Sequence, residues 1–180
     1  YPLKFNTIFK EKIWGGSKVK TILHKDYYPL PNCGETWEIS GIKGNANQVK
    51  NGFLKGNYLD ELVSVYMGDL VGEKVFQTYG ETFPLLIKFI DANDDLSVQV
   101  HPNNALAEKL HNENGKSEMW YVLQSDVNAK INIGFNTPMS KEKLEQHIQS
   151  NSLEKVLNYV DAKAGDVFYI PAGKVHAIGK

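Results

Sequence analysis

The segment 96–101 has polar residues at every second position. Successive side chains of a strand point to opposite faces, so Ser97, Gln99 and His101 would share one face. An amide oxygen and an imidazole nitrogen on one face can both bind a divalent metal ion. The alternative interpretation is a surface strand with its polar face in water, which is the commoner origin of such alternation.

The segment 116–121 would carry a second polar face, shared by Lys116, Glu118 and Trp120. A solvated strand rarely places a tryptophan beside a lysine and a glutamate, so this combination favours a cleft or an interface. Glu118 would contribute a carboxylate ligand and Lys116 a positive charge.

A third segment contains the more specific pattern G-x5-P-x-G-x2-H, which runs from Gly165 to His176. Gly165 is expected to turn the chain into a strand, and Pro171 and Gly173 to make a sharp turn before His176. The pattern resembles the second sequence motif of the cupin barrel. Gln99 and His101, followed after sixteen residues by Glu118, resemble an altered first cupin motif.

In such a barrel, Gln99, His101, Glu118 and His176 would converge on a site with two nitrogen and two oxygen ligands. Mixed ligands of this kind suit Zn²⁺, and they also suit Mn, Fe, Co or Ni. The residues alone therefore predict one divalent metal ion and leave its identity open.

The elements that must position these residues are mostly short strands. Eight segments are rich in β-branched or aromatic residues and are bounded by Gly, Asn or Asp. They are 36–40, 47–50, 85–91, 96–101, 118–123, 129–135, 166–170 and 175–178. This arrangement predicts a mainly β fold with helical insertions, of the cupin-type jelly-roll barrel class.

Helical insertions are predicted near 57–80 and 137–158. Apolar residues recur at helical spacing from Leu59 to Leu70, after a possible cap at Asn57. The second insertion would begin near Pro138 and run to Val156, and a short helix is expected at 105–111. No repeat or linker divides the chain, so residues 1–180 are predicted to form a single cupin-type metal-binding domain.

Composition excludes several classes of function. The basic residues number 20, all of them lysine, against 21 acidic ones, so the basic excess of a nucleic-acid-binding protein is missing. There is no apolar run of about 18 residues, so no membrane span is expected, and the N-terminus does not resemble a signal peptide. The single cysteine, Cys33, excludes an internal disulfide and suits a cytoplasmic location. No oligomeric state is predicted.

Blocks of sequence beyond the three candidate ligand segments also resemble one known family. The complete set of blocks is 11–16, 34–40, 83–88, 96–102, 116–121 and 171–179. Together they resemble the type I mannose-6-phosphate isomerases of the cupin superfamily, in their short bacterial form. The resemblance implies an aldose–ketose isomerase that interconverts mannose 6-phosphate and fructose 6-phosphate. It also implies one zinc ion per chain, bound by Gln99, His101, Glu118 and His176.

The resemblance implies substrate contacts as well. Trp14, Ser97 and Lys116 match substrate-site positions of the family, and Lys116 would neutralise phosphate or developing negative charge. Ser117 replaces the proline that is usual before the glutamate. Members of the family continue well beyond the last histidine and carry a catalytic arginine there. The chain has no arginine, so we expect an N-terminal portion that is inactive alone and has an open edge on its last strand.

The isomerisation moves a proton between C1 and C2 through a cis-enediol. It needs a base, a group that stabilises the oxyanion, and a contact to the phosphate. A metal ion with an open position can stabilise the enediolate, or it can only organise the cleft. The general base is not assigned.

Two alternative functions stay open. One is a non-catalytic cupin that binds a metal or a sugar, and the other is a metal-dependent cupin oxygenase. Gln99 as a fourth ligand argues against an oxygenase with two histidines and one carboxylate. Lys116 and Ser97 favour a phosphorylated hexose over both alternatives.

Overall fold

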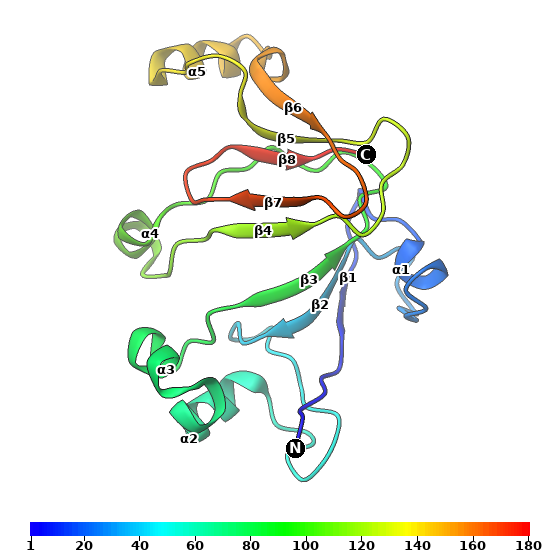
Figure 1. Cartoon of the computed structure of the whole chain (residues 1–180), viewed down its shortest axis with the longest axis vertical. Coiled ribbons are helices and arrows are strands. Elements are labelled where there is room, and N and C mark those ends of the chain that lie inside the picture. Colours follow the sequence, from blue (N-terminus) through cyan, green and yellow to red (C-terminus); the bar gives the residue numbers. More distant parts are fainter. The chain divides into compact units, whose positions relative to one another are not determined.

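The structure is a computed structural model that describes all residues, 1–180. The chain divides into two units, Tyr1–Asn93 and Asp94–Lys180 (Figure 1). Helices α2 and α3 fall in the first range predicted for a helical insertion, and α5 and a 3₁₀ turn fall in the second. The prediction of one domain over 1–180 stays a prediction.

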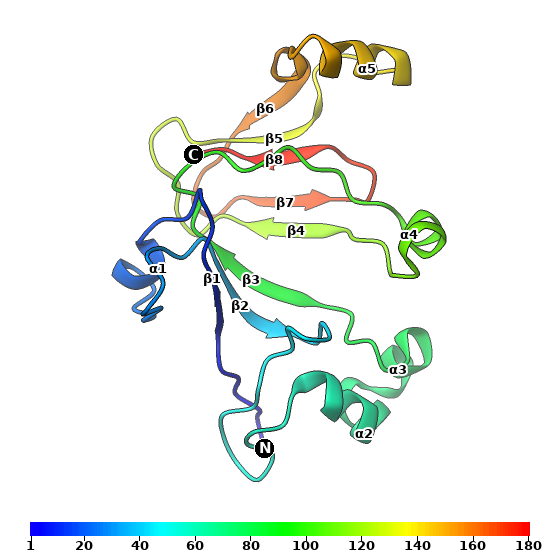
Figure 2. The ribbon, with the colours of Figure 1, turned by 180° about the vertical axis from the view of Figure 1, so that it is seen from behind.

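The first unit is built around a three-stranded antiparallel sheet. Its strands are β1 (Ile8–Lys10), β2 (Glu35–Ser40) and β3 (Leu86–Ile90), in the order β1-β2-β3. The helices are α1 (Lys18–Thr21), α2 (Leu59–Val71) and α3 (Glu73–Tyr79), and α2 and α3 pack against one another (Figure 2). Val19, Tyr27 and Cys33 form a buried cluster against which Phe9 and Leu30 pack.

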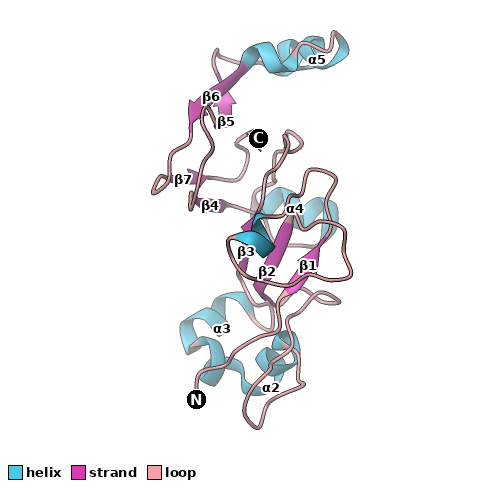
Figure 3. Cartoon of the chain, turned by 90° about the vertical axis from the view of Figure 1, so that its right-hand side faces the viewer, coloured by secondary structure: helices cyan, strands magenta, loops and turns pink.

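The second unit contains two small antiparallel sheets, seen from the side in Figure 3. One pairs β4 (Glu118–Tyr121) with β7 (Val167–Ile170). The other has the order β6-β5-β8, from β6 (Leu157–Asp161), β5 (Lys130–Phe135) and β8 (His176–Ile178). Its helices are α4 (Asn104–His111) and α5 (Lys141–Gln149), and the 3₁₀ turn spans Leu153–Val156.

The segment 96–99 pairs with the free side of β8. Gln99 and His176 exchange both backbone hydrogen bonds, at 2.8 and 2.9 Å, and Leu96 N donates to Ile178 O at 2.9 Å. The last strand therefore has a neighbour on each side, and the expectation of an open edge there was wrong. The prediction of a strand over 96–101 was nevertheless wrong, because only Gln99 makes an isolated bridge, to His176, and the rest of the segment lacks regular strand pairing.

Three other details differ from the sequence-based expectations. Residues 47–50 make isolated bridges rather than a strand. The helix predicted to run to Val156 ends at Gln149, and Asn151 adopts a φ of 49°. A 3₁₀ turn then leads into β6, whose residues 157–161 pair with β5. The cap of α2 is Tyr58, whose N–H donates to Glu61 Oε2 at 3.0 Å, while the Asn57 amide turns to Leu54 O.

The class of the fold is mainly β with helices between short antiparallel strands, as predicted. No helix has both the length and the apolar composition that crossing a bilayer would need.

Candidate metal centre

Two histidines and a glutamate meet in the second unit. The ligand atoms that His101, Glu118 and His176 can offer all lie within 4.8 Å of one another. Nε2 of His101 is 3.3 Å from Oε1 of Glu118, and Nε2 of His176 is 3.7 Å from Oε2. His101 follows the segment 96–99, whereas Glu118 begins β4 and His176 begins β8, so three separate segments build the cluster.

Strand pairing places Gln99 beside this cluster. Gln99 and His176 are direct partners in the antiparallel bridge, so their side chains share a face with Cβ atoms about 5 Å apart. The Nε2 amide of Gln99 donates to Ser97 Oγ at 3.0 Å. This orientation directs the amide NH₂ to Ser97 and leaves the amide oxygen as the group that can act as a ligand.

The imidazole nitrogens that face Glu118 lack hydrogen bonds. Nε2 of His101 and Nε2 of His176 are both buried, and neither has a hydrogen-bond partner. Leaving such an atom unsatisfied costs about 1–3 kcal/mol. A divalent ion between the two imidazoles and the carboxylate would satisfy both nitrogens, so the residues fit a metal ion.

A hydrogen bond at the other ring nitrogen of His176, Nδ1, fixes the tautomer of this imidazole. Nδ1 lies 2.8 Å from the backbone oxygen of Lys174. A carbonyl oxygen only accepts, so Nδ1 carries the proton and Nε2 presents its lone pair. This is the arrangement in which metal-binding histidines usually occur.

Charge in the cluster also favours a cation. Burial and the nearby Lys116 ammonium lower the pKa of His101, which keeps its imidazole neutral. Burial opposes ionisation of Glu118, but hydrogen bonds from Lys116 and Trp120 and the charge of Lys116 outweigh it and hold its pKa below the ordinary value. A neutral imidazole and an ionised carboxylate are the protonation states that metal binding requires.

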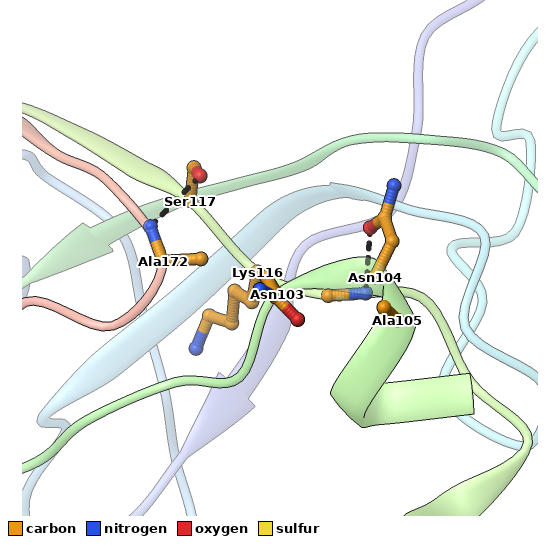
Figure 4. A pocket seen from close by; sticks show the side chains of 7 residues that line it. Asn103, Asn104, Ala105, Lys116, Ser117 and Ala172 are labelled. Atoms are coloured by element: carbon orange, nitrogen blue, oxygen red, sulfur yellow. Dashed lines mark hydrogen bonds between the residues drawn. The ribbon is translucent and has the colours of Figure 1, made fainter. Parts of the chain in front are cut away.

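A cavity of about 410 Å³ adjoins Lys116 (Figure 4). Small and polar residues from the start of α4, the following loop and the 171–173 turn line it. They are Asn103, Asn104, Ala105, Gly115, Lys116, Ser117 and Ala172. Gly115 N donates to Asn104 Oδ1 at 2.9 Å and Ala172 N donates to Ser117 Oγ at 3.1 Å. The loop that carries Lys116 is thus tied to both α4 and the turn.

The predicted substrate residues lie in different settings. Lys116 Nζ donates to Glu118 Oε1 at 2.8 Å, so its charge is already paired in part. Ser97 is exposed and accepts from Gln99. Trp14 belongs to the first unit, where its half-buried ring packs so closely on Gly34 that an added Cβ would meet Cζ3 at 2.7 Å. Packing of Trp14 is observed, and its part in a substrate site stays a prediction.

Two groups that support the cluster received no role from the sequence. The backbone oxygen of Lys174 orients His176, and no side-chain pattern signals a carbonyl. Trp120 donates from Nε1 to Glu118 Oε2 at 3.0 Å, and its ring meets that of His176 edge-on, with centroids 5.5 Å apart. The signal for Trp120 was its place on the same strand face as Glu118.

The sequence matches one family model and several named relatives. The family model for the phosphomannose isomerase type I catalytic domain matches residues 3–136. The mannose-6-phosphate isomerase of Streptococcus mutans is 42% identical over 179 residues, which is 99% of this chain and 54% of that protein. Mannose-6-phosphate isomerase ManA of Bacillus subtilis is also 42% identical, over 99% of this chain and 55% of that protein.

Solved structures give the same result for the fold. The crystal structure of the mannose 6-phosphate isomerase from Bacillus subtilis superposes with a TM-score of 0.87 at 36% identity, covering 99% of this chain and 55% of that chain. A phosphomannose isomerase mutant from Salmonella typhimurium shares the fold, with a TM-score of 0.77 at 14% identity. The chain spans about half the length of the curated relatives it matches. These matches confirm the cupin-type fold class, and the chain belongs to the type I phosphomannose isomerase family.

Proposed function

We propose that this chain supplies the metal-binding part of an isomerase that interconverts mannose 6-phosphate and fructose 6-phosphate. The observation that carries the proposal is the pair of buried, unpartnered Nε2 atoms of His101 and His176, which face the carboxylate of Glu118. It occurs in a chain that is 42% identical to proteins named as mannose-6-phosphate isomerases. We further propose that residues 1–180 act as one cupin-type domain and that the protein is cytoplasmic, in keeping with the free thiol of Cys33.

The proposed metal is one Zn²⁺ per chain, held by Gln99, His101, Glu118 and His176. Imidazole nitrogens and a carboxylate oxygen are typical zinc ligands, and Gln99 would add an amide oxygen. Other first-row ions bind such ligands too. When bound, zinc would supply Lewis-acid chemistry that stabilises negative charge on a sugar oxygen.

Lys116 is the residue proposed to act on the substrate's negative charge. Its ammonium lies 2.8 Å from Glu118 Oε1 and borders the adjoining cavity. A divalent cation on Glu118 would compete with Lys116 for this carboxylate and would turn the ammonium toward an anionic ligand. A charged hydrogen bond to phosphate or to a developing oxyanion contributes about 1.5–3 kcal/mol.

Ser97 and Trp14 are proposed to orient the sugar. Ser97 Oγ accepts from Gln99 Nε2, so its own O–H is the donor that it can offer to the substrate. Trp14 would provide an apolar wall. Contacts to a phosphate remote from the reacting carbons hold the substrate in place, and binding energy used in this way lowers the barrier.

The activity is best tested in a chimera, because this chain covers 55% of ManA from Bacillus subtilis. Residues 1–180 would replace the matching part of that enzyme, and turnover of mannose 6-phosphate would be followed with a coupled assay. We expect isomerase activity that is lost in His176→Ala. A folded chimera that binds zinc and mannose 6-phosphate without turnover would instead indicate a non-catalytic, sugar-binding cupin.

A further inference from the structure

Trp120 touches two of the three clustered ligand residues at once. It lies two positions after Glu118 on β4, on the same strand face, and its indole N–H donates to Glu118 Oε2 at 3.0 Å. Its ring meets the His176 ring edge-on, with an interplanar angle of 74°. Since His176 belongs to β8, this single side chain connects ligands from two different strands.

We propose that Trp120 is a positioning residue that holds the Glu118 carboxylate in the orientation required for metal binding. The inference rests on the metal centre proposed above. An indole N–H donates and cannot accept, so it favours the ionised carboxylate and can hold one oxygen in a fixed direction. With Oε2 held by Trp120, Oε1 points to Nε2 of His101, 3.3 Å away.

The strand pairing keeps the indole itself in place. Trp120 is the cross-strand partner of Phe168, and Glu118 is that of Ile170, within the paired strands β4 and β7. Both Trp120 and Glu118 are only partly exposed, so neither side chain is free to turn into solvent without losing packing. The hydrogen bond therefore joins two side chains that are each restrained by the sheet.

The first unit contains the same arrangement without histidines. Trp37 donates from Nε1 to Glu35 Oε2 at 2.8 Å, and Lys88 contacts Glu35 Oε1 at 3.2 Å. In the second unit, Trp120 holds Oε2 of Glu118 and Lys116 holds Oε1. Trp37 is thus a matched control, because it makes the same bond to a carboxylate that has no imidazole in its cluster.

The alternative is that Trp120 only fills space against His176. Replacement by phenylalanine separates the two roles, because Phe keeps an aromatic ring beside His176 and removes the N–H. Loss of a hydrogen-bonding partner behind a metal ligand typically lowers metal affinity 10–100-fold. A packing role alone would leave the affinity of Trp120→Phe close to that of the wild type.

The test measures Zn²⁺ affinity of the 180-residue chain by competition with a chelator, together with the visible spectrum of the Co²⁺ form. We expect Trp120→Phe to bind Zn²⁺ about 10–100-fold more weakly and to show an altered Co²⁺ spectrum. Trp37→Phe should match the wild type in both measurements. In a Glu118→Ala background, adding Trp120→Phe should cause little further loss, because the residue acts through Glu118.

The outcomes distinguish a failure of the Trp120 role from a failure of the proposed metal site. A wild-type chain that binds no Zn²⁺ overturns the metal site itself. A wild type that binds, with Trp120→Phe equal to it, overturns only the role of Trp120. If Trp120→Phe does not fold, a benzothienylalanine at position 120 keeps the two-ring shape without the N–H, and the same comparison of affinities decides.

Discussion

At the residue scale, two glutamates of this chain are held in the same way but have different neighbours. Glu35 and Glu118 each accept one hydrogen bond from a tryptophan two positions later and one contact from a lysine. Only Glu118 also faces two imidazoles. The carboxylate alone is therefore no indication of a metal site, and the unpartnered histidine nitrogens provide that indication.

Removal of a histidine should abolish tight zinc binding. His176→Ala takes away one of the two unpartnered Nε2 atoms, so the loss should exceed the roughly 10–100-fold expected from losing a supporting hydrogen bond. His147→Ala is the control, because His147 lies on α5 and bonds to Ser152 Oγ instead. Zinc content after dialysis and chelator competition measure the effect. Equal binding by both variants would contradict the assignment.

Removing the charge of Lys116 should strengthen metal binding and weaken substrate binding. Lys116→Met removes a cation 2.8 Å from Glu118 Oε1, so Zn²⁺ affinity at pH 8 should rise. Loss of the same charge should raise KM for mannose 6-phosphate about 10–150-fold in the chimera, equivalent to about 1.5–3 kcal/mol. Lys109→Met, on α4, should change neither quantity. An unchanged KM would place Lys116 outside the substrate site.

At the element scale, the helix α4 and the loop after it bring Lys116 and Glu118 to the cluster. Asn103 caps α4 by accepting from Leu106 N at 3.0 Å, and Asn104 accepts from Gly115 N. Gly115 lies so close to the backbone that a Cβ there would meet Asn104 N at 2.4 Å. Hydrogen bonds therefore fix the loop after α4 to the start of that helix, and the first turn of α4 also borders the cavity.

Two helix caps can be compared to test whether α4 positions Lys116. Asn103→Ala and Ser140→Ala each remove a side-chain cap, the second at α5, where Lys143 N donates to Ser140 Oγ. Each should cost about 0.5–2 kcal/mol of stability, measured by urea unfolding. Only Asn103→Ala should also raise KM in the chimera, because only α4 leads to Lys116. A similar rise in both variants would indicate a general loss of folded protein.

At the scale of the whole molecule, acid should destabilise the protein partly through the first unit. Burial disfavours ionised Glu35, but the Trp37 hydrogen bond and the charges of Lys88 and Lys12 outweigh it and lower its pKa. A carboxylate with a lowered pKa contributes stability above its unfolded value of about 4.5, and this contribution is lost as the pH falls through the folded value.

The variant Glu35→Gln tests the contribution of the ionised Glu35 carboxylate to stability. At pH 7 it should be less stable by about 1–3 kcal/mol, since Lys88 loses its charged partner. Between pH 5 and pH 3, roughly the carboxylate range, the wild type should lose more unfolding free energy than the variant. Urea unfolding curves at several pH values measure the difference. Parallel loss in both proteins would show that Glu35 does not contribute to acid sensitivity.

Local sequence patterns determined which residues carry the chemistry. The alternation in 96–101 and 116–121 and the turn pattern ending at His176 placed four candidate ligand residues on predicted strand faces, since a strand's two faces follow from the backbone alone. Helical spacing likewise predicted α2, because amphipathic periodicity is a local property. The resemblance of these blocks supplied the family, which the comparisons confirmed.

Only the tertiary structure decided how those faces meet. The pairing of Gln99 with His176, the second neighbour of β8, and the bonds of Glu118 to Lys116 and Trp120 depend on strand register and side-chain rotamers. β6 was not predicted from the sequence, and its strand character depends on pairing with β5. Backbone hydrogen bonds between distant segments are not visible in either segment's own composition. The sequence could therefore propose the ligand residues, but it could not predict the contacts between them.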